Sequence, residues 1–195
     1  MAMLKACARN KDIYRGIRIH ADLSKTGLLE KKSPYLVSAL ISMYARCGEL
    51  AKAHGVLQQQ DLRCLVSWNA LITAYARYGC DQDVIDCFEQ MQLEGVSPDP
   101  ITFSCVLRIC GNRGDVGMGQ AIHAEIERKG LFEMELVGTT LVDTYVKFDI
   151  LDAAEYVFDK LPIRDVVSWT ALISGYIDLG HNEVALEFFT EMRLE

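Results

Sequence analysis

The sequence predicts an all-α fold: a right-handed α-solenoid of about six helix–turn–helix repeats. Two observations predict this fold class: an internal repeat at a fixed distance, and apolar residues that recur at helical spacing within each repeat. The four prolines of the 195-residue chain add a third, because they fall at or beside the junctions between repeats. A helix-breaking residue does no harm at a junction, so long helices remain possible elsewhere.

The internal repeat is clearest in the segment 66–72, Val-Ser-Trp-Asn-Ala-Leu-Ile, which returns as Val-Ser-Trp-Thr-Ala-Leu-Ile at 167–173. Between 65–94 and 166–195, 12 of 30 positions are identical, which is too many to arise from composition alone. The distance of 101 residues divides as 35, 35 and 31. Six repeats follow, the first and last of them partial: 1–33, 34–64, 65–99, 100–134, 135–165 and 166–195.

Apolar spacing predicts two helices in each repeat. In the repeat 65–99 these are 68–77 and 82–94, and in the repeat 135–165 they are 137–148 and 151–161. Each pair of helices has an apolar face that it cannot bury alone, so stacked repeats are expected. Three glycines are expected to end second helices: Gly27, Gly95 and Gly130.

The charge balance argues against a generic basic nucleic-acid binder, because 20 Lys and Arg stand against 27 Asp and Glu, a net charge of −7. Positive charge is concentrated in residues 1–33, with eight Lys or Arg against three Asp or Glu. The seven cysteines form no Cys-x-x-Cys pair, so we expect reduced core residues, with a redox or metal role as the alternative.

The alternation of 35, 35 and 31 residues resembles the plant pentatricopeptide repeat (PPR) proteins of the PLS subclass, which combine regular, long and short motifs. The repeats 65–99 and 166–195 resemble the regular motif, 1–33 and 100–134 the long one, and 34–64 and 135–165 the short one. Tetratricopeptide repeats have a similar period, but their signature is missing. Neither end resembles a capping element, so we expect a fragment of a longer PPR array or a truncated gene product.

This resemblance implies that the protein binds single-stranded RNA and reads one base per repeat through the fifth and last residues of each repeat. The fifth residues are small and polar: Ser38, Asn69, Ser104, Thr139 and Thr170. The last residues are Cys64, Asp99, Met134 and Asp165. By resemblance, Asn69 with Asp99 implies uracil, Thr139 with Asp165 implies guanine, and Ser38 and Thr170 favour purines. The alternative is that the fifth residues only cap helices or face solvent.

Two further positions complete the expected interface. Second-position residues would pack against base faces, or alternatively form the core between repeats: Tyr35, Val66, Ile101, Leu136 and Val167. Basic residues at the thirteenth position would contact phosphates, or alternatively favour a helix C-terminus: Arg9, Arg46, Arg77 and Lys147.

The resemblance also implies a role in organellar RNA processing, in a mitochondrion or chloroplast, with C-to-U editing as the process. The alternative function is a protein-interaction scaffold, in which the repeat 100–134 docks an editing cofactor protein. End-to-end self-association is a further alternative for partners. No apolar run approaches the roughly 20 residues that span a bilayer, so no membrane partner is expected.

An enzymatic role is not expected, and no catalytic residue, metal or cofactor is assigned. His123-Ala124-Glu125 fits half of a zinc deaminase pattern, but the Pro-Cys-x-x-Cys half is missing. His123 also repeats as His20, which indicates a structural residue of the long motif. His54 and His181 have no recognisable ligand partners.

Overall fold

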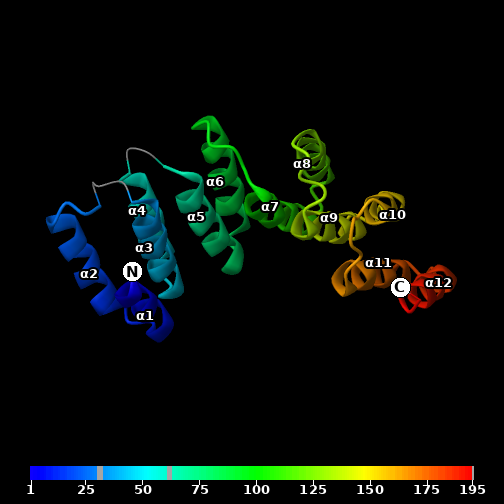
Figure 1. The fold of residues 1–195 in the computed structure, drawn as a ribbon, viewed down its shortest axis with the longest axis horizontal. Helices are drawn as coiled ribbons and strands as arrows, with labels where there is room; N and C mark the ends of the chain where they lie inside the picture. The colour runs from blue at the N-terminus through cyan, green and yellow to red at the C-terminus, as the bar shows by residue number, and fades with distance from the viewer. Residues whose placement is uncertain (30–32, 61–62, 195) are drawn as a thin grey trace. The chain divides into compact units, whose positions relative to one another are not determined.

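The computed structural model describes residues 1–29, 33–60 and 63–194, and these described residues contain α-helices but no strand (Figure 1). They divide into two compact units, Met1–Thr102 and Phe103–Glu195, here called the N-terminal and C-terminal units. The helices are α1 (Ala2–Asn10), α2 (Ile13–Lys25), α3 (Pro34–Arg46), α4 (Leu50–Gln58), α5 (Leu65–Arg77), α6 (Asp81–Leu93), α7 (Pro100–Arg113), α8 (Val116–Arg128), α9 (Glu135–Lys147), α10 (Leu151–Asp159), α11 (Val166–Asp178) and α12 (Asn182–Met192).

Both units are stacks of helical hairpins. In the N-terminal unit α1 pairs with α2, α3 with α4 and α5 with α6, and the first helices pack side by side, α1 on α3 and α3 on α5. In the C-terminal unit α9 pairs with α10, α11 pairs with α12, and α9 packs on α11. The predicted all-α solenoid is therefore confirmed. No helix in the described ranges is both long and apolar enough to cross a bilayer.

First helices begin earlier than the apolar pattern indicated: α5 begins at Leu65 and α9 at Glu135. In α5 the reason is a capping box, in which the backbone N–H of Cys64 donates to the Ser67 hydroxyl at 3.1 Å. Second helices can end earlier than the pattern, since α10 stops at Asp159 while Leu161 is still buried. Leu161 thus keeps the apolar spacing of α10 although it lies beyond the end of that helix.

Each hairpin turns through a residue with a left-handed backbone, at the fifteenth position of its repeat. Glycine holds this position at Gly48, Gly79, Gly114 and Gly180, whereas Lys11 (φ 54°) and Asp149 (φ 57°) hold it in the other two repeats. Gly27, Gly95 and Gly130 follow α2, α6 and α8 with positive φ, which confirms that they end second helices.

The cysteines bear out the expected core role in part. Cys7, Cys87, Cys105 and Cys110 are buried, and no disulfide occurs in the part of the chain that the structure describes. Burial raises the pKa of Cys87 to about 12 and that of Cys110 to about 11. Both thiols therefore stay protonated at neutral pH, which makes them poor nucleophiles and poor metal ligands. The described ranges also contain no group of three or more His, Cys, Asp or Glu arranged to hold a metal ion.

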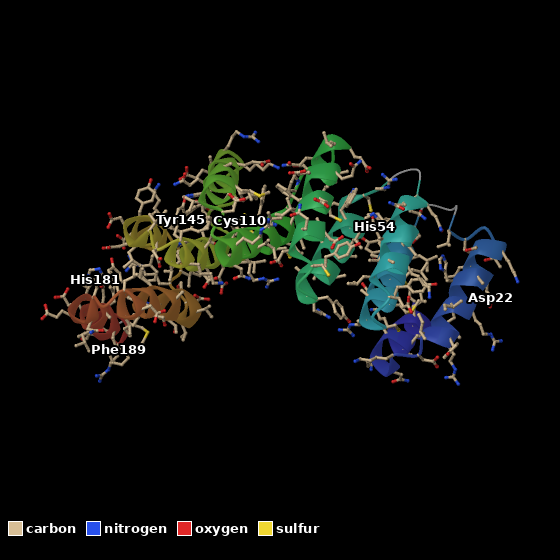
Figure 2. The ribbon with its side chains drawn as sticks, turned by 180° about the vertical axis from the view of Figure 1, so that it is seen from behind. Asp22, His54, Cys110, Tyr145, His181 and Phe189 are labelled. Carbon is tan, nitrogen blue, oxygen red and sulfur yellow. The ribbon has the colours of Figure 1, made fainter. Side chains whose placement is uncertain are left out.

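Four tyrosines form hydrogen bonds between successive repeats, a feature not predicted from the sequence. Each lies at the eleventh position of a first helix, and its hydroxyl meets a side chain from the second helix of the preceding repeat (His54 and Tyr145 are labelled in Figure 2). The pairs are His20–Tyr44, His54–Tyr75 and His123–Tyr145, each at 2.8 Å, and Glu155–Tyr176 at 2.7 Å. These histidines therefore serve as hydrogen-bond partners between repeats.

Candidate nucleic-acid interface

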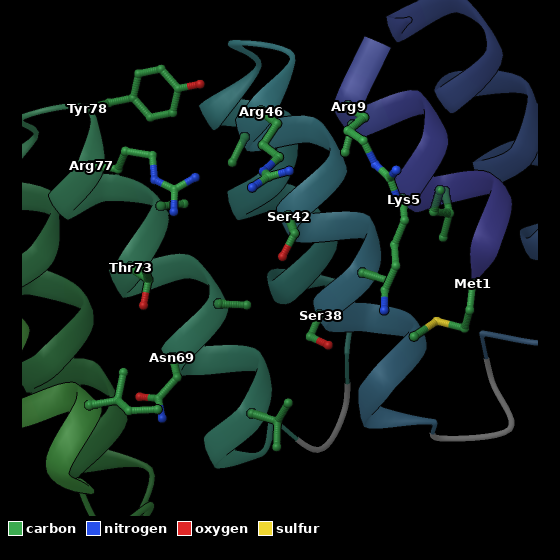
Figure 3. Close-up of a pocket in the computed structure, with 18 residues that line it drawn as sticks. Met1, Lys5, Arg9, Ser38, Ser42, Arg46, Asn69, Thr73, Arg77 and Tyr78 are labelled. Carbon is green, nitrogen blue, oxygen red and sulfur yellow. The ribbon is translucent and has the colours of Figure 1, made fainter. Parts of the chain in front are cut away.

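An open groove of about 620 Å³ runs across the first helices of the N-terminal unit (Figure 3). We call it the first-helix groove. It is lined by residues of α1, α3 and α5 with their flanking positions, and by Ile101 at the start of α7. Its described lining includes no residue of α2, α4 or α6. The acidic helix α6, with Asp81 and Asp83 in its first turn, thus lies outside the groove wall.

Helical geometry arranges the groove side chains in three rows. Residues four apart lie on one face of a helix, so the fifth, ninth and thirteenth positions of each repeat point the same way. Figure 3 shows all nine: Met1 just before α1, Lys5 and Arg9 on α1, Ser38, Ser42 and Arg46 on α3, and Asn69, Thr73 and Arg77 on α5. The candidate base-reading residues Ser38 and Asn69 therefore share a groove with the candidate phosphate-binding arginines.

The groove is positively charged although the chain as a whole is acidic. Arg9, Arg46 and Arg77 are exposed, and each is without an ion pair or hydrogen bond to the residues that the structure describes. Lys5 joins them one helical turn before Arg9, and none of the described lining residues is acidic. Lys5 was missed in the sequence, although its four-residue spacing from Arg9 was a usable signal.

Asn69 is the most constrained of the candidate base-reading residues. Its Nδ2 donates to Asp99 Oδ2 at 2.9 Å, so the fifth and last residues of the repeat 65–99 are in direct contact. Its Oδ1 accepts from the hydroxyl of Thr102 at 2.6 Å. The other Asp99 oxygen, Oδ1, accepts from the backbone N–H of Thr102 at 2.9 Å and so caps the start of α7. The side chain of Asn69 is half-buried and reaches the groove with a fixed amide.

Three of the remaining fifth residues, Ser38, Ser104 and Thr170, have hydroxyls that donate to backbone carbonyls. The Ser38 hydroxyl donates to the carbonyl of Tyr35 at 3.1 Å, that of Thr170 to the carbonyl of Val166 at 2.6 Å, and that of Ser104 contacts the carbonyl of Leu136 at 3.5 Å. Their oxygens keep a lone pair that can accept from a base.

Helix capping does not account for the fifth residues, because the N-cap position of these first helices is held by the last residue of the preceding repeat. Cys64, Met134 and Asp165 are the N-cap residues of α5, α9 and α11. Asp165 accepts from the backbone N–H of Ser168 at 2.7 Å. Among the described residues no hydrogen bond joins Thr139 to Asp165, unlike the pair Asn69 and Asp99.

The second-position residues lie outside the core. Their exposed fractions are 66% for Tyr35, 39% for Val66, 48% for Ile101, 52% for Leu136 and 62% for Val167. These values argue against the alternative that they form the core between repeats. Val66 and Ile101 line the first-helix groove, as Asn69 does.

The corresponding positions of the C-terminal unit have a different charge. Lys147 forms an ion pair with Asp143 one turn earlier on α9, with Nζ and Oδ2 at 2.7 Å. The expected phosphate contact at Lys147 therefore has a competing carboxylate. On α11 the thirteenth position is acidic, at Asp178. The positive row of Arg9, Arg46 and Arg77 is thus a property of the N-terminal unit.

Comparisons with known proteins find the same repeat. A model of the PPR repeat family matches residues 63–112, and a PPR repeat model matches residues 35–59 and 167–195. A chloroplastic pentatricopeptide repeat-containing protein of Arabidopsis thaliana is 33% identical over the whole of this chain and 31% of its own length. A putative mitochondrial one from the same plant is 35% identical over the same shares. The chain thus spans about a third of these relatives.

Among solved structures, the pentatricopeptide repeat protein PPR10 in complex with an 18-nucleotide psaJ RNA element matches with a TM-score of 0.72. The match covers 91% of this chain and 27% of that chain at 24% sequence identity. PPR10 from maize matches with a TM-score of 0.52 at 17% identity. At 24% and 17% sequence identity, these matches support a shared fold.

Proposed function

Because this chain belongs to the pentatricopeptide repeat family, we propose that it binds single-stranded RNA along its first helices and reads one base per repeat. The observation that carries the proposal is the three-row arrangement of the first-helix groove. RNA presents phosphates, base faces and base edges, and each needs a different kind of side chain. The groove offers arginines on all three first helices, small polar groups on α3 and α5, and the exposed apolar residues Val66 and Ile101.

Base recognition is proposed at the fifth and last residues. The amide of Asn69 carries both a donor and an acceptor, which suits the Watson–Crick edge of a pyrimidine. Val66 and Ile101, whose apolar side chains line the same groove, would contact the two faces of that base. We propose uracil for Asn69 with Asp99, and guanine for Thr139 with Asp165. Ser38, Ser104 and Thr170 would read further bases.

Phosphate binding is proposed at Arg9, Arg46 and Arg77, with Lys147 as a weaker contributor because Asp143 competes for it. Since the chain carries a net charge of −7, its overall charge opposes the binding of a polyanion. Binding by the chain alone should therefore be weak and strongly dependent on salt.

The proposed biological role is selection of a site for RNA processing in a mitochondrion or chloroplast, with C-to-U editing as the process. The relatives described as chloroplastic or mitochondrial support the compartment. We propose no reaction for the chain itself. His123, which carries half of a deaminase pattern, is paired with Tyr145 between repeats.

The test is fluorescence anisotropy with short oligoadenylates that contain U-A-G, G-A-U or a scrambled arrangement of the same nucleotides. The repeats 65–99 and 135–165 lie two repeats apart, so U and G should be separated by one nucleotide. One of the two orders should bind more tightly than the scrambled RNA at low salt. Equal affinity for all three would contradict base reading. A partner protein that stays bound after nuclease treatment, and is lost on mutation of 100–134, would favour the scaffold alternative instead.

A further inference from the structure

Thr102 lies behind the candidate base-reading residue and is inaccessible to solvent. It occupies the first turn of α7 with an exposed fraction of 0%. Its hydroxyl oxygen is 2.6 Å from Asn69 Oδ1 and 3.0 Å from Asp99 Oδ1, and it accepts from the backbone N–H of Asp99 at 3.3 Å. A hydroxyl has one proton to donate, and the shorter distance directs it to Asn69.

We propose that Thr102 is a positioning residue that fixes the orientation of the Asn69 amide and thereby sets the preference for uracil over cytosine. This inference rests on the proposed function, because it concerns the base that Asn69 would read. Thr102 itself would not touch the RNA. It would act through Asn69, from the far side of the groove wall.

The amide orientation follows from two hydrogen bonds, one in which the Asn69 nitrogen donates and one in which its oxygen accepts. Asp99 needs a donor from Asn69, and the Thr102 hydroxyl supplies a donor to the other end of the amide. Rotating the amide by half a turn would place Oδ1 against the Asp99 carboxylate and Nδ2 against the hydroxyl proton. The contact of Oδ1 with the carboxylate would then be repulsive, and the hydroxyl could accept from Nδ2 only by giving up its 2.6 Å bond and turning its proton to Asp99 Oδ1 at 3.0 Å. The observed orientation is therefore favoured by both partners.

That orientation matters because the two pyrimidines differ in polarity. Uracil presents an N–H donor at N3 and an acceptor at O4, whereas cytosine presents an acceptor at N3 and an amino donor at N4. An amide that turns freely can match either pattern by exchanging its oxygen and nitrogen. A fixed amide matches one of them and leaves an unsatisfied pair with the other, which is costly in a partly buried site.

Equivalent positions in the chain make different bonds. The hydroxyl of Ser67, at the start of α5, donates to the carbonyl of Cys64 at 2.8 Å. The hydroxyl of Ser168, at the start of α11, donates to the carbonyl of Asp165 at 2.9 Å. Both stay within their own helix start, whereas Thr102 reaches the fifth residue of the preceding repeat. Ser168 therefore offers a matched control.

The experiment measures the ratio of affinities for oligoadenylates that carry U-A-G or C-A-G, in the order that wild type prefers, for wild type, Thr102→Val, Thr102→Ser and Ser168→Ala. Thr102→Val keeps the shape and removes the hydroxyl, so it should lower the uracil-to-cytosine ratio by about fivefold, the effect of one hydrogen bond. Thr102→Ser should restore the ratio to within about twofold of wild type, and Ser168→Ala should leave it unchanged.

Two failures can be told apart. If wild type prefers U-A-G to scrambled RNA and Thr102→Val keeps the full ratio, the inference about Thr102 is wrong and the proposed function stands. If wild type shows no preference for any arrangement, both are wrong.

A second readout needs no variant of Thr102 and no RNA. Among the four asparagines of the chain, the side-chain N–H₂ of Asn69 should exchange with solvent most slowly in NMR, with its signal assigned by its loss in Asn69→Ala. Exchange as fast as that of Asn10 or Asn112 would overturn the inference, even if Thr102→Val did not fold.

Discussion

His123 Nδ1 lies 2.8 Å from the hydroxyl of Tyr145, which joins α8 to the first helix of the next repeat. Burial of the imidazole lowers the pKa of His123 below its ordinary 6.5, and nearby Lys160 acts in the same direction while Glu127 opposes it. Burial also lowers the pKa of His20, which makes the same bond to Tyr44. Both contacts between repeats thus favour a neutral histidine.

Stability should therefore fall on mild acidification. Between pH 6.5 and the lower folded-state pKa, the unfolded chain binds protons that folded His20 and His123 exclude. The stability that the two neutral histidines contribute should be fully present above pH 6.5. The free energy of unfolding should decrease as the pH drops through this window. Thermal unfolding across the window measures the effect. The double variant His20→Gln and His123→Gln should show a flatter dependence, and an equally steep one would contradict this origin.

Gly119 should be intolerant of a side chain. A Cβ at this position of α8 would lie 2.6 Å from the ring of Phe148, so Gly119→Ala should cost about 1–3 kcal/mol of stability through overpacking. Gly117 is the matched control on the same helix, because its Cβ would meet only Asp115 Oδ1, at 3.9 Å. Gly117→Ala should be neutral or stabilising in denaturant unfolding. Similar effects of both changes would argue against close packing at Gly119.

Arg77 should contribute to RNA affinity through charge alone. Arg77→Ala should weaken binding of every oligoadenylate alike and reduce the slope of log affinity against log salt by about 0.7, the value for one phosphate contact on a single strand. Arg15→Ala removes the same charge from α2, where Arg15 pairs with Asp12 at 3.3 Å, and should leave the slope nearly unchanged. Equal slopes for the two variants would place the phosphates elsewhere.

Asp165 should have separable structural and recognition roles. As the N-cap of α11 it accepts from Ser168, so Asp165→Ala should cost about 1 kcal/mol of stability, whereas Asp165→Asn should cost little because asparagine caps equally well. If Asp165 also helps Thr139 to select guanine, Asp165→Asn should lose the preference for G over A in the probe while keeping its thermal stability. A retained preference would leave Asp165 with the capping role only.

The fold was readable from the sequence because each repeat carries the same local signals. Apolar spacing gave the helices, and Gly27, Gly95 and Gly130 marked their ends correctly. The predicted start of α5 was three residues late, because a capping box at Cys64 and Ser67 holds its first turn. The predicted start of α9 was two residues late. The end of α10 was predicted two residues too late, because Leu161 is buried although it lies beyond the helix.

The candidate interface was only partly readable. Its rows follow from four-residue spacing along each first helix. Asn69 was predicted through the family resemblance, and Arg77 from the basic residues at the thirteenth position of the repeats. The ion pair of Lys147 with Asp143 was also visible at four-residue spacing but was overlooked. Thr102 could not be found this way, because its bond to Asn69 spans 33 residues and depends on how two helices pack. The same holds for His54 and Tyr75.

Base preference in Asn69→Ala tests the reading of one nucleotide per repeat most directly. The measurement is the affinity of wild type and Asn69→Ala for oligoadenylates in which the U and the G of the preferred order are each replaced in turn. The preference for U should disappear in the variant, while the preference for G two nucleotides away is retained. If Asn69→Ala weakens every RNA by the same factor and leaves both preferences unchanged, Asn69 is structural and the account is contradicted.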